Sequence, residues 1–351
     1  MSGAAPDRII VRAAELKRFA SALFARAGMT AQHADLVADV LVWADLRGLD
    51  THGVSRIPLY LRLLSNGDMN PRAQISVSRD TPASVLLDGD RGAGPAVMMQ
   101  AMQAAVDKAR AAGIGMAFAR RTTHTAALGY YTLAAAREGM AAIAFAASSP
   151  NMAYHGARAA AVSTSPISIA VPGGDHGPIV LDMSTGVISL GRLMQANKLG
   201  LSLPAGSAID KAGNPTTDGA SAHVPLPMAG PKGSGLSLMI EFIVSLITSN
   251  PLLAETLEGS SEGRRHRQNG ALIAIDISQF CDNATFATEV QRLVTAIKAL
   301  PADVGGIRMP GERGDLLQEQ RLRDGIPLLS ATCNELRLAA AKFDVQMFDQ
   351  L

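Results

Sequence analysis

The chain has 351 residues, and its 32 Lys and Arg residues against 31 Asp and Glu residues give a net charge of +1 at pH 7. This length predicts about two domains of roughly 150 residues each. The balanced charge and an aromatic content of only 4% give no electrostatic or base-stacking footprint for nucleic acid or an anionic membrane. The 48% hydrophobic fraction indicates a globular metabolic protein with substantial cores.

Cysteine usage predicts a reducing compartment. Only Cys281 and Cys333 occur, and no Cys/His spacing would build a zinc site. We expect two small buried thiols, with a disulfide between them as the alternative. The longest apolar stretch, residues 236–247, is shorter than the ~20 residues of a bilayer span and contains Glu241. The charged residues between positions 7 and 18 leave no signal-peptide core, so we expect a soluble, cytoplasmic protein.

The N-terminal 47 residues have a helical pattern. Apolar positions from Ile10 to Phe24 lie roughly on one stripe, and Thr30 can cap a second helix that runs to Arg47. Gly48 then suits a left-handed helix end, which makes 49–56 a turn directly after a packed helix. A short helix over 58–64 should follow.

The middle of the chain alternates between short apolar runs and helical patterns, which is typical of an α/β domain. Segment 198–235 is rich in Gly, Pro and Thr and is expected to form long loops. The predicted strands are 84–87, 115–119, 141–146, 167–171, 179–183 and 271–277. The predicted helices are 95–112, 129–138, a buried helix over 236–248, 284–300, and a last one through 334–342 with Pro327 at its mouth.

These patterns predict a central α/β domain over residues 75–306. It is flanked by a helical domain made of residues 1–74 and 307–351, in which the C-terminal helix joins the N-terminal element. A dinucleotide enzyme usually shows the glycine fingerprint GxGxxG between a strand and a helix. Here Gly92 and Gly94 are followed by Val97, so a Rossmann oxidoreductase is improbable and a nicotinamide cofactor must be held differently.

The densest polar cluster lies in the turn after the second predicted helix. Thr51, His52 and Arg56 place a hydroxyl, an imidazole and a guanidinium within six residues. An imidazole suits proton transfer to a carbonyl oxygen near neutral pH, and a guanidinium can clamp a carboxylate through two hydrogen bonds. The alternative is structural: Asp50 and Thr51 act as caps, and Arg56 pairs with Asp45.

His124 is the second candidate for proton transfer. It follows the predicted strand 115–119 and precedes a helix, and ligands of open α/β sheets lie at the carboxyl ends of strands. The alternative is a loop histidine that caps the next helix.

Three further segments could meet a cofactor. Asp182 ends the predicted strand 179–183 and could orient a histidine or contact a nicotinamide or ribose, with helix capping as the alternative. Lys232 lies where the 236–248 helix opens, and backbone N–H groups at a helix start together with an ammonium suit a phosphate. Glu312 and Arg313 form a loop pair that could bind ribose or phosphate.

Taken together, these segments resemble the malate/L-lactate dehydrogenase family that is unrelated to Rossmann enzymes. That family includes L-sulfolactate and ureidoglycolate dehydrogenases and reductases of cyclic imine 2-carboxylates. The resemblance is carried, in order along the chain, by Ala44-Asp45-x-Arg47-Gly48-x-Asp50-Thr51-His52-Gly53-x-x-Arg56-x-Pro58-x-Tyr60, by His124-x-x-x-x-Gly129-Tyr130-Tyr131, by Val180-Leu181-Asp182-Met183-Ser184-Thr185, by Gly213-Asn214-Pro215-Thr216-Thr217-Asp218 and by Lys232-Gly233-x-Gly235-Leu236.

The resemblance implies a non-Rossmann α/β fold, NAD or NADP as cofactor, and a homodimer. It implies hydride transfer between the nicotinamide and C2 of a small 2-oxo or 2-hydroxy acid, with a cyclic imine carboxylate as the alternative substrate. It also implies His52, or else His124, as acid/base, and a catalytic or cofactor role for Asp182. Substrate-side positions would be Thr51, Arg56 and Tyr60, and the remaining cofactor contacts would be Ser148, Met183, Ser184, Lys232, Gly311, Glu312 and Arg313.

Overall fold

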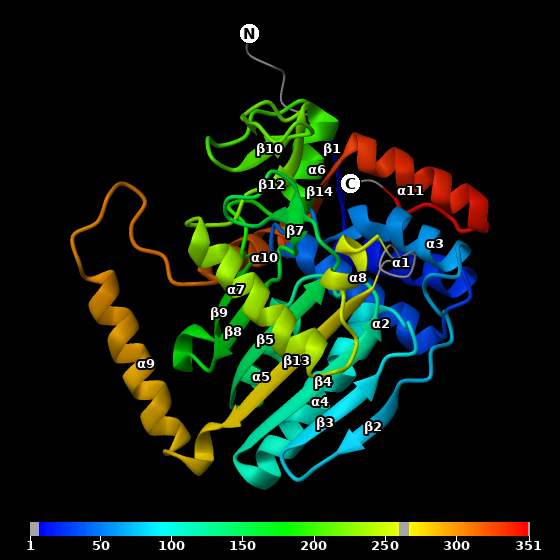
Figure 1. The fold of residues 1–351 in the computed structure, drawn as a ribbon. Coiled ribbons are helices and arrows are strands. Elements are labelled where there is room, and N and C mark those ends of the chain that lie inside the picture. The colour runs from blue at the N-terminus through cyan, green and yellow to red at the C-terminus, as the bar shows by residue number, and fades with distance from the viewer. Residues whose placement is uncertain (1–6, 260–266, 350–351) are drawn as a thin grey trace. The chain divides into compact units, whose positions relative to one another are not determined.

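The computed structural model describes residues 7–259 and 267–349 (Figure 1). The chain divides into two compact units, residues 1–73 with 311–351 and residues 74–310. Each unit has its own hydrophobic interior, so each is described by itself. The assignment of a substrate-side and a cofactor-side role to them stays a prediction.

The first unit is mainly helical. Its helices are α1 (Ala13–Arg26), α2 (Ala31–Leu46), α3 (Ile57–Ser65), α10 (Glu312–Asp324) and α11 (Ser330–Phe343), with a short 3-10 turn η1 (Val54–Arg56). Helix α2 buries ten of its side chains, and Thr30 caps it by accepting a hydrogen bond from the His33 amide at 3.3 Å, as predicted. Because apolar residues surround α2, it is the central helix of the unit.

A two-stranded antiparallel ribbon brings the two ends of this unit together. Strand β1 (Arg8–Val11) pairs with β14 (Ile326–Leu329), with Ile10 opposite Pro327. The helical prediction for residues 8–11 was therefore wrong, and Pro327 lies in a strand rather than at the mouth of a helix. The β-branched run Ile9, Ile10 and Val11 suits a strand once a distant partner is available.

The second unit is built on a seven-stranded mixed sheet with the order β2-β3-β4-β13-β5-β8-β9. Its strands are β2 (Ser76–Asp80), β3 (Ser84–Asp88), β4 (Ile114–Thr122), β5 (Met140–Ser148), β8 (Ile167–Val171), β9 (Ile179–Met183) and β13 (Gln268–Asp276). Strand β13 lies between β4 and β5 and is antiparallel to both. The α/β class is confirmed, and the central antiparallel strand separates this sheet from the all-parallel doubly wound type.

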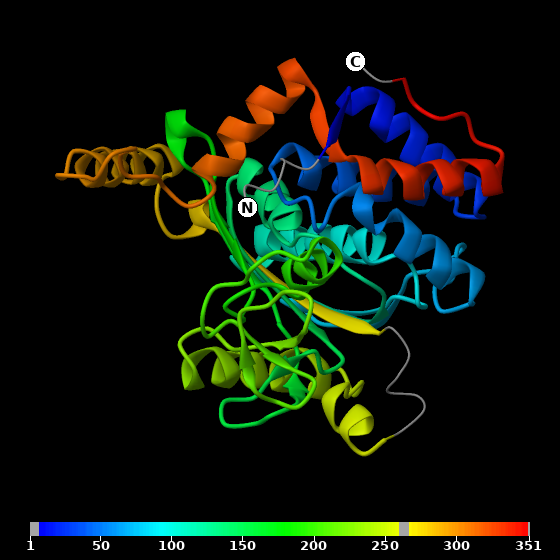
Figure 2. The same cartoon turned by 90° about the horizontal axis from the view of Figure 1, so that it is seen from above.

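Helices cover both faces of this sheet (Figure 2). On one face α4 (Gly94–Ala112) and α5 (Gly129–Arg137) pack against Ala117 and Ala119 of β4. On the other face α7 (Pro231–Glu241), continued by the π-helical turn η3 (Phe242–Leu246), packs against Met116 and Phe118. The alternation along β4 places its small residues under the long helix α4, which can therefore approach the sheet closely.

Two expectations for this unit need correction. Segment 198–235 contains β10 (Ala208–Asp210), β11 (Pro215–Thr216) and β12 (Ala222–Pro225), which form a small sheet rather than loops alone. The 236–248 helix is buried on one side only. The remaining elements of the second unit are β6 (Met152–Ala153), β7 (Ala160–Val162), η2 (Gly174–His176), α6 (Leu190–Leu199), α8 (Leu253–Leu257), η5 (Ile277–Gln279) and α9 (Asn283–Lys298).

Candidate active site

Three of the predicted site residues lie at one edge of the sheet in the second unit. Strands β4, β5 and β9 run parallel to one another because each pair is separated by one antiparallel strand. Their carboxyl ends therefore meet at the same edge, where His124 follows β4, Ser148 ends β5 and Asp182 lies near the end of β9. Gln268 at the start of β13 pairs with both Thr122 and Ser148 across this edge.

The loop that carries His124 is held in an unusual backbone conformation. Arg121 and Ala126, three residues before and two after, have φ angles of +55° and +56°, which non-glycine residues rarely adopt. The Arg121 amide donates to Asn269 Oδ1 at 3.2 Å, and the Thr125 amide donates to Gln268 Oε1 at 3.0 Å. Such conformations persist where the surroundings over-determine them, and they cluster at functional sites.

The hydrogen bonding of His124 selects one form of its ring. The Ala126 amide donates to Nδ1 at 3.3 Å, so Nδ1 is an acceptor and the neutral ring carries its proton on Nε2. The ring is half-buried. In this form His124 carries a hydrogen-bond donor, Nε2–H, without being protonated.

Gly92 and Gly94, which do not complete a dinucleotide-binding GxGxxG motif, pack against this same loop. A Cβ atom on Gly94 would lie 2.1 Å from the His124 carbonyl oxygen. The Gly94 amide also donates to Thr123 Oγ1 at 3.2 Å, and Thr123 Oγ1 donates to the Gly92 carbonyl at 3.0 Å. The glycines thus allow the backbone of the His124 loop to approach the start of α4.

Asp182 caps a helix in this structure. Its Oδ2 accepts a hydrogen bond from the Gly129 amide at 2.7 Å, at the first residue of α5. A carboxylate is favourable at a helix N-terminus. The alternative, that Asp182 caps the next helix, is wrong as to the helix: Asp182 caps the preceding α5, whereas Ser189 caps the next helix, α6. Because α5 follows the His124 loop directly, the same contact ties β9 to that loop.

Ser148, Ser184 and Lys232 lie on segments that contact one another. Ser148 Oγ accepts from the Asn151 amide group at 3.3 Å, and Asn151 in turn accepts from the Thr164 amide at 2.8 Å. The segment after β9 joins them, since the Thr185 amide donates to the Thr164 carbonyl at 3.1 Å. Residues 228–233 at the start of α7 pack on that segment, because a Cβ on Gly233 would lie 2.5 Å from the Thr185 carbonyl.

The start of α7 offers a side-chain cation rather than free backbone N–H groups. The amides of Lys232, Gly233 and Ser234 all donate to carbonyls of residues 228–230, at 3.4, 2.9 and 3.3 Å. The expectation that these amides would cradle a phosphate was wrong, because the tight turn before the helix already uses them. The exposed Lys232 ammonium remains suited to a phosphate.

Thr51, His52 and Arg56 come together in the turn of the first unit. Thr51 Oγ1 lies 3.1 Å from His52 Nδ1, and Arg56 Nε donates to the Thr51 carbonyl at 2.5 Å. The Arg56–Asp45 pair, which was the structural alternative, does not form; the Asp45 carboxylate instead accepts the Val54 amide at 2.8 Å. A Cβ on Gly53 would lie 1.9 Å from Asp45 Oδ1, so this turn requires glycine there.

Burial shifts the titration of this turn. Burial and the neighbouring Arg56 cation lower the pKa of His52 to about 4, so its imidazole is neutral at pH 7. Burial likewise lowers the pKa of Arg56 and raises that of Tyr60. Tyr60 is fully buried, with its ring centroid 5.9 Å from that of Phe24.

The predicted loop at Glu312 and Arg313 is wrong, because both residues form the first turn of α10 in the same unit. Gly311 has φ +86° and caps α10, and its carbonyl accepts from Arg47 Nη2 at 3.1 Å. Arg313 is exposed and Glu312 half-exposed. The sequence interpretation missed Arg321, Gln268 and Asn269, because nothing local marks a residue whose partners are far along the chain.

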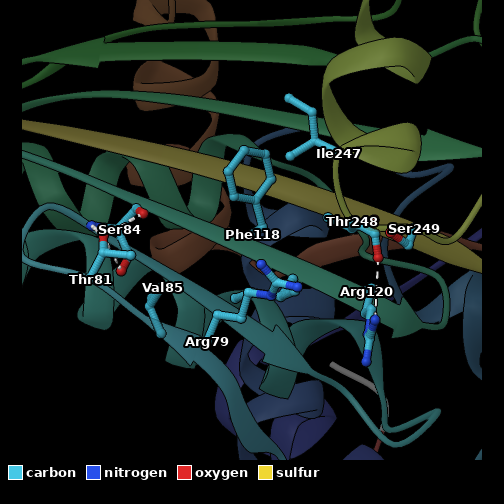
Figure 3. Close-up of a pocket in the computed structure, with 10 residues that line it drawn as sticks. Arg79, Thr81, Ser84, Val85, Phe118, Arg120, Ile247, Thr248 and Ser249 are labelled. Atoms are coloured by element: carbon cyan, nitrogen blue, oxygen red, sulfur yellow. Dashed lines mark hydrogen bonds between the residues drawn. The ribbon is translucent and has the colours of Figure 1, made fainter.

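A cavity of about 360 Å³ opens on the second unit (Figure 3). None of the predicted site residues lines it. Arg120 reaches from it to the Thr248 carbonyl at 3.3 Å. The cavity is lined by Arg79, Thr81, Ser84, Val85, Leu86, Phe118, Arg120, Ile247, Thr248 and Ser249.

The described residues offer no metal site and no membrane-spanning helix. Among residues 7–259 and 267–349, no group of three His, Cys, Asp or Glu side chains could hold a metal ion. No helix in these ranges is long and apolar enough to cross a membrane. Cys281 is exposed and Cys333 is buried, and both are free thiols, so the alternative disulfide does not form and only one thiol is buried as expected.

Comparison with known proteins agrees with the geometry. The family model for malate/L-lactate dehydrogenase matches residues 11–337. The L-sulfolactate dehydrogenase of Methanocaldococcus jannaschii is 34% identical over 322 residues, which covers 89% of this chain and 92% of that protein. The Δ1-pyrroline-2-carboxylate/Δ1-piperideine-2-carboxylate reductase of Pseudomonas putida is 32% identical over 315 residues, covering 89% of this chain and 91% of that protein.

Solved structures extend the likeness to the whole fold. The crystal structure of malate dehydrogenase from Entamoeba histolytica superimposes with a TM-score of 0.91 at 26% identity, covering 97% of this chain and 99% of that one. The predicted family and fold are confirmed. The chain belongs to the malate/L-lactate dehydrogenase family and is an oxidoreductase.

Proposed function

We propose that this protein transfers a hydride between a nicotinamide cofactor and C2 of a small 2-oxo or 2-hydroxy acid. The observation that carries the proposal is the Thr51-His52-Arg56 turn, in which an imidazole that is neutral at pH 7 lies beside a half-buried guanidinium. Relatives that act on malate and sulfolactate support this substrate class.

Arg56 is suited to the substrate carboxylate. Its Nε is occupied by the Thr51 carbonyl, so a carboxylate would meet Nη1 and Nη2 through two parallel hydrogen bonds. Within its own unit no carboxylate of the described residues forms an ion pair with it. A half-buried cation without a counterion is stabilised by an anionic ligand.

His52 is the proposed proton-transfer residue. In the oxidising direction its neutral ring can accept the hydroxyl proton, and Thr51 Oγ1 at 3.1 Å can accept a hydrogen bond from Nδ1–H of the ring that results. His124 is the rival, and its ring form suits a hydrogen-bond donor to the reacting oxygen. Asp182 would act through α5 by holding the His124 loop.

The residues present fit a nicotinamide dinucleotide, which when bound supplies the hydride acceptor or donor. Ser148, Met183 and Ser184 lie at the sheet edge that carries His124, and Lys232 belongs to a segment that contacts theirs. Glu312 and Arg313 are proposed as further contacts for ribose or phosphate. These groups suit either NAD or NADP.

A homodimer in the cytoplasm is part of the proposal. Helix α7 and its extension expose apolar side chains at spacings of three and four residues, which form a continuous stripe. We name these the α7 stripe: Met239, Phe242, Ile243, Leu246 and Ile247, exposed by 37–60%. A second copy of this chain would cover the stripe. Two free thiols support a reducing compartment.

The test is a panel of 2-oxo acids with NADH and NADPH, followed by variants. We expect oxaloacetate, pyruvate or sulfopyruvate to oxidise NAD(P)H, and Arg56→Gln to raise the KM for the acid about 10- to 100-fold, since charged hydrogen bonds contribute about 1.5–3 kcal/mol. Arg62→Gln, an exposed charge on the next helix turn, should change nothing. An unchanged KM in Arg56→Gln would contradict the clamp.

The histidines need a direct comparison. We expect His52→Gln to lower kcat about 10²- to 10⁴-fold, the usual range for loss of a general acid or base. His124→Gln should retain more activity, because His124 would polarise the oxygen rather than exchange its proton. The reverse order would transfer the proton-transfer role to His124.

A cyclic imine 2-carboxylate is the second candidate substrate, since the Pseudomonas putida reductase is similar over most of its length. Faster NAD(P)H oxidation with pyrroline-2-carboxylate than with any 2-oxo acid would favour it. Cofactor binding without turnover on either panel would instead indicate a nucleotide-binding homologue that is catalytically inactive.

A further inference from the structure

We propose that Arg321 is a positioning residue, which from α10 holds the Asp50-Thr51-His52 turn in its working conformation. The inference rests on the proposed function of that turn. The Arg321 side chain is 10% exposed, and its Nη1 donates both to the Asp45 carbonyl and, at 2.8 Å, to Asp50 Oδ1. A single buried guanidinium therefore bridges the end of α2 and the residue before Thr51.

The turn depends on such contacts because it has little regular structure of its own. Residues 47–53 lie between α2 and the short η1 turn. The His52 amide donates to the Leu49 carbonyl at 2.7 Å, and Ser55 Oγ donates to the Asp50 carbonyl at 2.7 Å. These local bonds fix the backbone near Asp50, but among the described residues only Arg321 connects Asp50 to a distant helix by a side-chain hydrogen bond.

Asp45 holds the other side of the turn. Its carboxylate accepts the Val54 amide and packs on Gly53, while its backbone carbonyl accepts from Arg321. The cation at this carbonyl is also favourable because it lies in the last turn of α2. The segment from Asp50 to Val54 is thus clamped at both ends, with Thr51 and His52 between the clamps.

A second arginine, Arg47, reaches from the end of α2 to α10, whereas Arg321 reaches from α10 to the end of α2. Arg47, 6% exposed, donates to the Gly311 carbonyl at 3.1 Å and to Gln318 at 3.2 Å, and forms an ion pair with Asp315. It therefore fixes the start of α10, which carries Glu312 and Arg313, two of the proposed cofactor contacts. The two arginines should consequently separate in function: Arg321 governs the substrate turn, and Arg47 governs residues 311–313.

The experiment compares Arg321→Gln and Arg321→Lys with Arg323→Gln. Arg323 lies on the same helix, has a side chain 72% exposed and pairs only locally with Asp324. We expect Arg321→Gln to lower kcat/KM for the acid about 10- to 100-fold, since displacements of about 1 Å cost that much, with the Kd of NAD(P)H changed less than about 2-fold. Arg321→Lys should recover part of the loss, and Arg323→Gln should match the wild type.

Hydrogen exchange by mass spectrometry supplies a readout that needs no turnover. In Arg321→Gln, exchange should rise in peptides covering 48–56 and stay unchanged in 114–122. If Arg321→Gln showed the same kinetics as the wild type, or exchanged faster throughout the chain, the positioning role of Arg321 would be overturned. A wild type inactive on every substrate would overturn the proposed function, whereas selective loosening at 48–56 would still support Arg321 as the residue that positions the turn.

Discussion

At the residue scale, the two histidines differ in what their Nδ1 atoms face. His52 Nδ1 faces the Thr51 hydroxyl, which can donate or accept, so the ring can gain and lose a proton without losing this contact. His124 Nδ1 faces a backbone amide, which can only donate, so protonation there would break the bond. This difference is the physical reason to assign proton exchange to His52 and polarisation to His124.

Gly94→Ala should damage the His124 loop selectively. An added Cβ would lie 2.1 Å from the His124 carbonyl, so the loop must move. We expect kcat to fall at least about 10-fold, because small displacements of a reacting group are costly. Gly235→Ala is the control, since a Cβ there meets nothing within 4 Å. Steady-state kinetics decides, and equal kcat values in both variants would contradict this account.

The stability of the protein should depend on pH through His52. Its pKa in the folded chain is about 4, whereas an unfolded histidine titrates near 6.5. Between these values the unfolded chain binds a proton that the folded chain does not, so the free energy of unfolding decreases as pH falls through this window.

Comparison with a variant isolates this contribution. Burial raises the pKa of Asp45, which acts in the opposite direction on acidification. The measurement is therefore the difference in urea-unfolding free energy between wild type and His52→Gln at pH 7 and at pH 5. The wild type should lose more stability than the variant, while the exposed His223→Gln should behave as wild type. Parallel losses in all three proteins would refute the low pKa.

At the element scale, the π-helical turn η3 is held by a buried carboxylate. Glu241, 4% exposed, accepts the amides of Leu252 and Leu253 at 2.9 and 3.2 Å and the Ser245 hydroxyl at 2.7 Å. Asn269 donates to Ser245 Oγ at 3.0 Å and thereby connects this network to β13. The same residue accepts the Arg121 amide, so the network reaches the His124 loop.

Glu241→Ala should destabilise the second unit. It would leave three donors without their acceptor in a buried region, which costs about 3 kcal/mol. Urea unfolding measures the change, with the exposed Glu258→Ala as control. A loss below about 1 kcal/mol would show that water or relaxation satisfies these donors.

At the scale of the whole molecule, the α7 stripe determines the expected assembly. Five apolar side chains on one face of a helix are too many for isolated surface residues, and a continuous apolar stripe of this kind usually marks an interface. The opposite face of the same helix packs on the sheet through Leu236, Ile240 and Val244. The helix is thus apolar on both faces, one against the sheet and one exposed. We propose that a second copy of this chain covers the exposed face.

Phe242→Glu should convert a dimer into a monomer, because it places a charge in the middle of the proposed interface. Sedimentation equilibrium measures the mass. Leu338→Glu is the control, since Leu338 is 74% exposed on α11 and lies outside the stripe. If Phe242→Glu keeps the oligomeric state of the wild type, the stripe is not the interface.

The sequence by itself determined the alternation of strands and helices, the cap at Thr30, the family and the identity of the turn around His52. These depend on patterns within about 20 residues or on motifs in a fixed order. It could not place Pro327 in a strand, because that strand exists only through pairing with residues 8–11. Nor could it show that the amides before α7 are already used.

Tertiary structure alone decided how the turn around His52 is held. Asp45, Arg47 and Asp50 lie close together in sequence, but their partners Gly311, Asp315 and Arg321 are more than 260 residues further along. Such pairs leave no local pattern, because a buried guanidinium needs only a nearby carbonyl and carboxylate, whatever their distance along the chain. The residues of the turn were readable from sequence; the helix that holds them required the fold.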